Sequence, residues 1–460
     1  MAERCIRSLL MLTLFFLPFQ TQWIIREGWM ATSVWQYGTL SFFISDALII
    51  ALIIAIIVQW LRGPRSSIIP RAESRSAFLA MIVFMIWSFL SIWWSLDRWV
   101  ALWHAAWVLE AGALGFIVFY NRCYRRVMIW SFLIGALFQA CIGVTQFVTQ
   151  MSYASTIMGW ALHNPADLGT SVIDTGIRRW LRAYGGMPHP NIFGGFMAIS
   201  LLLYGCEMQG VLVSLRQRFE SSERLAALMS VAGLWLGYCI ILIGLLLSFS
   251  RSAWLAFVVG FIIWFLGQGR PKPYKQLIAT VIVIVIVVVP FWEPFSTRVT
   301  VNKRLETKSL EERQGGYRQS WELIKHHPWI GAGIGNYTNS LQVIDDHPTT
   351  NDPMTTISMP KKAWDYQPVH NAFVLVLAEL GIIGLLLLLL SLWGSFRIMN
   401  NELRIMERFT FILHTSYFIL PVIILALFDH YLWSLHVGLL IAAAVIALGA
   451  IEDKKVSAVY

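Results

Sequence analysis

The chain has 460 residues, of which 57% are apolar and only 13% are charged, and its mean hydropathy is +0.63. A soluble domain carries about 25% charged residues, so this composition excludes a soluble globular protein and indicates an integral membrane protein. The net charge of +9 does not indicate nucleic-acid binding, because the basic residues lie in short clusters between apolar runs and form no extended basic face.

Apolar runs of about 17 to 25 residues, the length that crosses a membrane, recur along the whole chain. They predict about twelve transmembrane helices, at 5–25, 40–61, 76–95, 99–120, 127–150, 190–208, 226–249, 252–267, 276–292, 369–394, 409–427 and 432–450. The first run follows Arg4 and Arg7 but lacks the small residues of a cleavage site, so we interpret it as a retained signal anchor. The expected fold is an all-α polytopic membrane protein, with nine spans in 1–292, a large, partly helical loop in 293–368, and three spans with a short tail in 369–460.

Lysines and arginines predict the orientation of these helices. One set of alternate connections, which includes both termini, holds clusters of basic residues, whereas the short connections of the other set hold only Arg26, Arg98 and Arg251. Because short cytoplasmic loops are enriched in basic residues, both termini are expected in the cytoplasm. The long segments 151–189 and 293–368 are then expected on the opposite face.

The larger of these segments predicts a helix over 311–326, because apolar and aromatic residues recur there at helical spacing. Gly331, Gly333 and Gly335 alternate after it. Such an alternation occurs in nucleotide-binding turns, but no strand precedes it here. A tight turn packed close to another backbone is the favoured interpretation.

Arg251 lies in a short turn between two predicted spans, flanked by Ser250 and Ser252. A guanidinium at a helix end can simply extend to the membrane interface. In this turn, however, the flanking hydroxyls leave it little room to reach bulk water. Because an arginine is always charged and its fork matches a phosphate group, Arg251 is a candidate phosphate-binding residue.

Arg182 and His189 lie in the polar stretch that leads into the predicted span at 190–208. This stretch fits an architectural turn as well as a binding site, because it contains Gly185-Gly186 and a proline near a helix start. If it forms a site, Arg182 is the better candidate.

Two arginines lie on the predicted loop helix. Arg313 has Glu311 and Glu312 beside it, which is typical of a solvated helix face. Arg318 has aromatic neighbours, Tyr317 and Trp321, rather than acids. We therefore expect Arg318 to face a ligand in preference to Arg313.

His370 and Asn371 stand at the outer mouth of the predicted span at 369–394. A lone histidine is commonly a satisfied polar residue, but a polar pair at the edge of so apolar a run indicates function. A neutral imidazole there could accept a proton from an attacking hydroxyl. Asp429, in the last outside turn, is also unusual between apolar spans and is expected to pair with an arginine or to cap a helix.

A divalent metal ion is the alternative to arginines as the source of positive charge. Asp345, Asp346, His347 and Asp352 offer hard ligands in the long polar loop. Acidic residues in such loops are mostly surface residues. The prediction is therefore a site without a metal.

Together these features resemble the O-antigen ligase and O-antigen polymerase superfamily. The histidine motif of that family is matched by His370-Asn371 followed at the family's spacing by Gly381 and Gly384, and its other signatures are similar to the segments 250–252 and 318–335. The resemblance covers mainly residues 180–400, and the twelve-span plan with a large loop before the histidine extends it.

The resemblance implies a metal-independent, cofactor-free, inverting glycosyltransferase of the bacterial inner membrane with a periplasmic active site. Such enzymes transfer a glycan from undecaprenyl pyrophosphate to a sugar hydroxyl of lipid A-core. On this basis His370 would be the base or orienting group, and Arg251 and Arg318 would hold the pyrophosphate, with Arg182 a third cation. Fixed arginines in a water-poor site stabilise the charge that grows on a departing pyrophosphate.

Two alternatives remain open at this point. An O-antigen polymerase uses the same donor with another acceptor, which these motifs do not encode; the single loop before the histidine helix favours a ligase by analogy. A transporter or flippase for lipid-linked glycans would also have many spans and intramembrane charge, but transporters commonly show internal repeats, and the polar groups here gather on one side.

Overall fold

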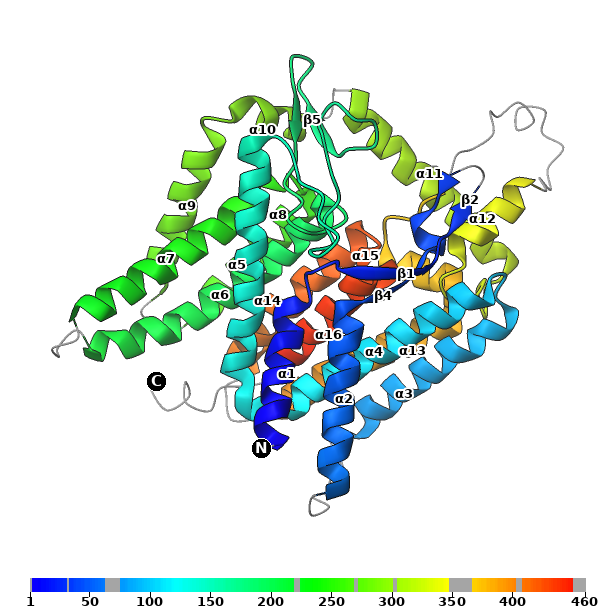
Figure 1. Cartoon of the computed structure of the whole chain (residues 1–460), viewed down its shortest axis with the longest axis horizontal. Helices are drawn as coiled ribbons and strands as arrows, with labels where there is room; N and C mark the ends of the chain where they lie inside the picture. The colour runs from blue at the N-terminus through cyan, green and yellow to red at the C-terminus, as the bar shows by residue number, and fades with distance from the viewer. Residues whose placement is uncertain are drawn as a thin grey trace.

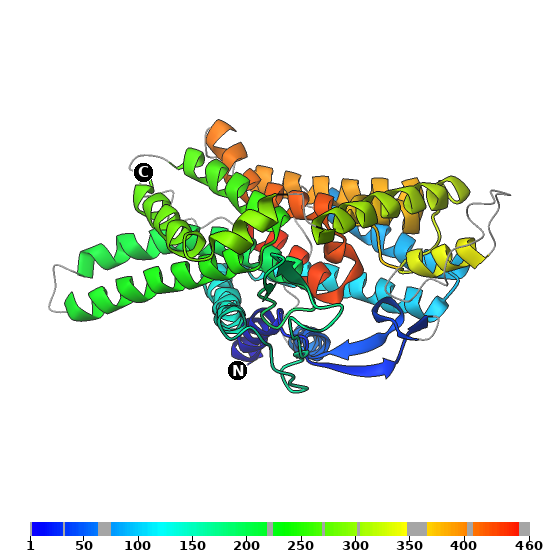
Figure 2. The ribbon, with the colours of Figure 1, turned by 90° about the horizontal axis from the view of Figure 1, so that it is seen from above.

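The computed structural model describes residues 2–30, 33–62, 75–218, 224–268, 272–300, 304–346, 366–402 and 408–449. The long helices that coincide with the predicted spans are α1 (Ala2–Phe16), α2 (Ile44–Arg62), α3 (Arg75–Leu90), α4 (Arg98–Tyr120), α5 (Arg125–Thr149), α6 (Pro190–Arg218), α7 (Arg224–Leu247), α8 (Arg251–Gly267), α9 (Tyr274–Val288), α13 (Ala372–Glu402), α14 (Arg408–Phe428) and α16 (His436–Gly449). They form one elongated helical body, from which α6 and α7 extend together at one end (Figures 1 and 2).

The helices confirm an all-α polytopic membrane protein. Among the described residues, six helices are long and apolar enough to cross a membrane, namely α2, α4, α5, α6, α7 and α13. The pair formed by α9 and α10 (Trp292–Val299), bent by 100°, adds a seventh if it is one broken span, and other predicted spans, including those at α8 and α16, are shorter apolar helices. Of the twelve predicted spans, six or seven therefore correspond to described helices that are long enough to cross a membrane.

Short elements complete the segments between these helices. They are the helices α11 (Arg304–His326), α12 (Tyr337–Asp346) and α15 (Tyr431–Ser434), the 3-10 turns η1 (Gln36–Gly38), η3 (Ser91–Trp94) and η4 (Arg122–Tyr124), and three antiparallel pairs made by β1 (Gln22–Arg26) with β4 (Leu40–Phe43), β2 (Trp29–Met30) with β3 (Ser33–Val34), and β5 (Val172–Asp174) with β6 (Arg179–Leu181). The helix predicted over 311–326 is confirmed as the second part of α11.

The first two predicted spans are longer than the helices that the structure shows. The expected helix at 5–25 ends at Phe16, two residues before Pro18, because a proline disfavours helical geometry in the residue before it. The chain then forms β1, which pairs with β4 in the register Gln22 with Phe43, so the expected start of the second span at 40 is a strand.

Helix α6 is the core of the bundle, because its membrane-spanning part is the most deeply buried among the candidate spans. Two glycines in its first turns allow this. A side chain at Gly194 would meet the Ser248 hydroxyl at 2.5 Å, and one at Gly195 would collide with the hydroxyl of Tyr431. The start of α6 therefore lies directly against the turn that precedes α8 and against α15.

Helix α13 is broken at Gly381, where φ is 69° and ψ is −175°. The turn after α11 fills the break: the amides of Ala332 and Gly333 donate to the carbonyls of Ala378 and Glu379 at 2.9 and 2.8 Å. In return, the Ile382 amide donates to a carbonyl of that turn at 3.0 Å. Backbone groups in a membrane helix must be satisfied within the protein, so these bonds explain how the break is tolerated. The expected tight glycine turn packed against another backbone is confirmed.

Candidate functional site

Arg182 is buried, with 4% of its surface exposed, and its guanidinium joins three segments. Its Nε donates to the Ser248 carbonyl at 2.8 Å, its Nη1 to the Ser171 hydroxyl at 2.9 Å and its Nη2 to the Asn191 side-chain oxygen at 2.7 Å. The rigid five-donor fork of arginine suits this use. Arg182 thereby fixes the start of α6 relative to the turn before α8.

Asn191 connects Arg182 to Asp429 by hydrogen bonds. Its Nδ2 donates to Asp429 Oδ2 at 2.9 Å, and the other carboxylate oxygen accepts from the backbone amide of His430 at 2.9 Å. Burial acts to raise the pKa of Asp429, but the neighbouring histidines and the Asn191 amide together lower it. The carboxylate is therefore ionised at neutral pH. The sequence left open whether Asp429 pairs with an arginine or caps a helix; the structure links it to Arg182 through Asn191.

Histidines surround this carboxylate. The ring of His370 meets the ring of His430 edge to face with centroids 5.3 Å apart. Burial lowers the pKa of His370, and also lowers the pKa of His430 to about 4 and of His189 to about 3. At neutral pH these imidazoles are uncharged, so a nitrogen of His370 can accept a proton.

Arg313, on α11, is a cation close enough to His370 to influence its pKa. Its charge lowers the pKa of His370, after burial and against the opposing effect of Asp429. Its Nε is buried and has no hydrogen-bond partner among the described residues. Gly316, on the same face of α11, lies against Val369, and the Asn371 amide reaches the Tyr317 hydroxyl at 3.4 Å. This face of α11 therefore covers the segment that carries His370.

Arg318 has a different position. Five residues after Arg313, it lies about 140° around the helix. It is exposed and lines a pocket of about 350 Å³ together with Gln319, Trp321, Glu322, Leu341 and Ile344. The structure thus brings Arg313, the less favoured of the two in sequence, to His370, and it places Arg318 at a separate pocket between α11 and α12.

Arg251 is the first residue of α8, after Ser250, whose hydroxyl caps the helix by accepting from the Ala253 amide. The turn before it is held by two other guanidiniums. Arg182 donates to the Ser248 carbonyl, and Arg298 donates to the Phe249 carbonyl at 2.9 Å. No motif in the sequence singles out Arg298, which lies in the last turn of the short helix α10. Arg182 and Arg251 are thus brought to one turn.

Sequence reasoning also missed the role of Glu379, an acid within the apolar run of α13. Its carboxylate accepts from Trp433 Nε1 at 2.8 Å and from the backbone amides of Gly335 and Tyr337. It therefore ties α13 to α15 and caps the start of α12. An ionisable residue inside an apolar run indicates function or a specific partner, and that signal could have revealed it.

Two groups of side chains could hold a metal ion. The ligand atoms of His370, Asp429 and His430 lie within 4.8 Å of one another, as do those of a second group inside the bundle, Asp46, Glu110 and His436. In the first group both Asp429 oxygens already accept hydrogen bonds, and His430 Nδ1 is within 2.6 Å of the Ser434 hydroxyl. The metal site considered at Asp345, Asp346, His347 and Asp352 falls partly outside the described residues.

The fold and site define a polytopic helical membrane protein with an ionised carboxylate, neutral imidazoles and arginines gathered at one end of its bundle. Residues 236–389 match the family model described as O-antigen ligase. This match agrees with the resemblance to the O-antigen ligase family that the sequence motifs carry. No curated protein matches the chain.

Proposed function

We propose that the protein is a glycosyltransferase that ligates a glycan from undecaprenyl pyrophosphate onto lipid A-core in the bacterial inner membrane, with both termini cytoplasmic and the site on the periplasmic face. The match of residues 236–389 to the O-antigen ligase family model supports lipid-linked glycan chemistry in general. The observation that carries the finer proposal is the cluster of His370, Asp429 and Arg313 at the mouth of α13.

In the proposed reaction, the acceptor hydroxyl loses its proton to a nitrogen of His370 as its oxygen attacks the anomeric carbon. The oxygen attacks the face opposite the pyrophosphate, so the anomeric centre is inverted. The bond from that carbon to the pyrophosphate oxygen breaks, and the departing pyrophosphate takes the electron pair. Asp429, ionised and beside His370, stabilises the imidazolium that forms.

Arginines supply the positive charge for the leaving group in this proposal. Arg251 and Arg313 are the candidates at the site itself, and Arg318 remains a proposed donor-binding residue at the neighbouring pocket. Arg182 has its guanidinium committed to Ser248, Ser171 and Asn191, so we assign it to positioning Asp429. Arginine charge makes a metal ion unnecessary for this step. His189 and Asn371 complete the polar lining.

A reconstituted transfer reaction tests the proposal. Lipid-pyrophosphate glycan and lipid A-core are incubated with wild type, His370→Ala or Arg251→Ala protein, with and without EDTA. We expect product from wild type in both conditions and a loss of about 10²-fold or more with His370→Ala.

Other outcomes identify the alternatives. Undiminished transfer by His370→Ala would remove the proposed base, and loss of wild-type product in EDTA would establish a metal requirement. Glycan elongation on undecaprenyl pyrophosphate, without transfer to lipid A-core, would identify a polymerase. Movement of the donor across vesicles without any joining of glycans would identify a transporter.

A further inference from the structure

A groove of about 670 Å³ runs between α3 and α4, away from the histidine cluster. Its lining is apolar apart from one arginine, and consists of Ile82, Met85, Ile86, Phe89, Leu90, Ile92, Trp93, Leu109 and Arg98. Several of these side chains are exposed, among them Ile86 and Leu109. From Ile82 to Trp93 the groove extends roughly 16 Å along the helix axis, about half the thickness of a bilayer core. Its depth therefore matches one leaflet.

One end of the groove has the side chains expected at a membrane interface. Trp93 and Trp99 stand at this end with 73% and 63% of their surfaces exposed, and exposed tryptophans of this kind gather at the level of lipid headgroups. Arg98 is the first residue of α4 and stands between them. A lipid in the groove would therefore place its headgroup beside Arg98.

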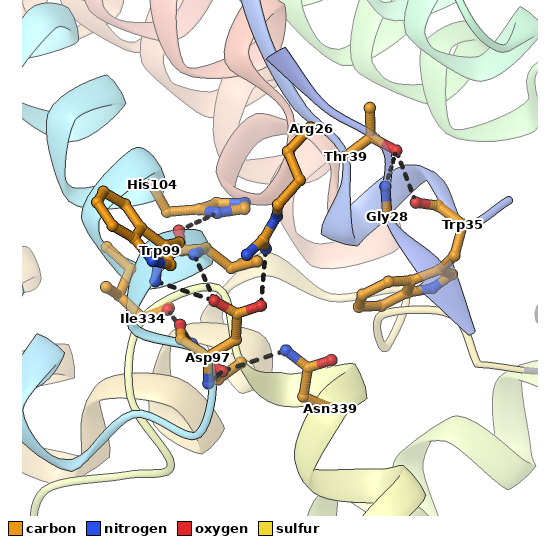
Figure 3. A network of polar contacts seen from close by, with 11 residues as sticks. Arg26, Gly28, Trp35, Thr39, Asp97, Trp99, His104, Ile334 and Asn339 are labelled. Carbon is orange, nitrogen blue, oxygen red and sulfur yellow. Dashed lines mark hydrogen bonds and ion pairs between the residues drawn. The ribbon is translucent and has the colours of Figure 1, made fainter. Parts of the chain in front are cut away.

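Among the described residues, Arg98 has no acidic partner in an ion pair. The neighbouring Asp97 is committed to Arg26, with 2.7 Å between the ion-pair atoms, and to the backbone amide of Trp99 at 2.9 Å (Figure 3). Within the described part of the chain, the Arg98 guanidinium makes a single long contact, 3.5 Å, with the Trp93 carbonyl. Arg98 thus complements an anionic headgroup.

The groove is joined to the reaction site by the glycine turn. Asn336, at the end of that turn, accepts from the Asp97 amide at 2.7 Å, and Gly333 lies against Ser95. The same turn fills the break in α13, the helix that begins just after His370. A lipid anchored in the groove is therefore near the site without occupying it.

We propose that this groove binds the lipid anchor of the acceptor, with an acyl chain in the groove and a headgroup phosphate on Arg98. The proposal rests on the proposed ligase function. In the donor, the reacting bond joins the sugar directly to the pyrophosphate of the lipid, so the donor headgroup must lie at His370. In the acceptor, core sugars separate the reacting hydroxyl from the lipid, so its anchor is expected at a distance. A groove one leaflet deep suits an acyl chain better than a long polyprenyl chain.

Binding of lipid A-core to protein in phosphatidylcholine nanodiscs tests this proposal independently of catalysis. The assay uses His370→Ala protein, in which we expect turnover to be lost, and adds Arg98→Gln or Ile86→Trp. We expect each added change to weaken lipid A-core binding about tenfold, through loss of a charge-assisted contact or filling of the groove. The matched controls are Arg178→Gln, an arginine stacked on Trp180, and Ile278→Trp, an exposed isoleucine of α9; they should leave binding unchanged.

Dephosphorylated lipid A-core identifies the contact. Removing the phosphates should weaken binding to the His370→Ala protein but have no further effect when Arg98 is glutamine. Unchanged binding in both groove variants would show that ordinary phospholipid fills the groove and would overturn the proposal. A larger Michaelis constant for the donor alone, measured with Arg98→Gln in the active background, would assign the groove to the donor and also overturn it. Failure of the ligase function itself would appear separately, as a wild type that transfers no glycan to lipid A-core.

Discussion

Two regions meet at His370, and they are built differently. The first, which we call the buried junction, consists of Arg182, Asn191, Asp429 and the Ser248 turn, and its polar atoms are satisfied by one another. The second, which we call the α11 arm, spans 304–326 and offers Arg313 with a buried Nε that has no partner among the described residues. The hydrogen bonds of the buried junction are formed without a substrate. The α11 arm keeps an N–H donor that a substrate can engage.

The difference indicates a division of labour. Groups that must keep a fixed geometry, such as a carboxylate that orients an imidazole, belong in a rigid network whose members hold one another. A group that binds a charged substrate must keep hydrogen-bonding capacity free for it, since a buried donor without a partner is costly. Substitutions in the buried junction should therefore affect stability and rate together, and those in the α11 arm should affect substrate binding and the pH profile.

The largest effect is expected from Asp429→Asn. The amide keeps the size of the side chain but loses the charge that raises the pKa of His370 and stabilises its protonated form. We expect transfer to fall by about 10²- to 10³-fold, since that is the range for general acid and base groups. The control is Asp174→Asn, a half-buried residue whose carboxylate accepts from the Gly176 amide. A rate within threefold of wild type would remove Asp429 from the mechanism.

Arg182→Lys is expected to damage the buried junction while keeping its charge. A lysine cannot reproduce the fork, so at least two charge-assisted hydrogen bonds are lost, at a cost of about 3 kcal/mol. We expect a thermal unfolding midpoint several degrees lower, together with a reduced rate. Arg179→Lys, at a half-buried arginine that donates to the Ala166 carbonyl, should leave both unchanged. Loss of donor affinity at full stability would instead place Arg182 in the binding machinery.

Much of the fold follows from the sequence because the membrane imposes simple rules on it. Long apolar runs must be helices there, and the predicted spans coincide with helices. The exceptions are local: Pro18 ends the first helix early, and β1 and β4 occupy the ends of two expected spans. The glycine turn was predicted to pack against a backbone, but only the structure identifies its partner as the break at Gly381.

The candidate site was only partly accessible, because sequence neighbours are not neighbours in space. The adjacent Glu311 and Glu312 predict a solvated Arg313, yet successive residues of a helix point in different directions. Its position relative to His370 depends on how α11 packs against Val369, which no local pattern encodes. The bond from Asn191 to Asp429 joins residues 238 positions apart, and a single sequence carries no signal for it.

A smaller effect is expected from Arg313→Gln. Compared with Arg318→Gln, this variant tests directly which arginine of the α11 arm serves His370. Arg313 lowers the pKa of His370, so its removal should raise that pKa. A base is active when unprotonated, so the acidic limb of the pH profile should move to higher pH. Donor binding should weaken about tenfold as well. Arg318→Gln should leave the acidic limb in place, and the opposite pattern would show that Arg318 is the residue that serves His370.

The smallest effect is expected at the exposed end of the α11 arm. Lys325 pairs with Glu322 at 2.9 Å, but both side chains are more than half exposed. Solvent screens such pairs, so Lys325→Gln should change the free energy of unfolding by less than about 0.5 kcal/mol. Glu322 also lines the pocket that contains Arg318. Measuring donor affinity with Lys325→Gln therefore tests whether a change of charge at this pocket alters donor binding. If donor affinity is unchanged in Lys325→Gln but reduced in Arg313→Gln, the electrostatic contribution of the α11 arm comes from the face that meets His370.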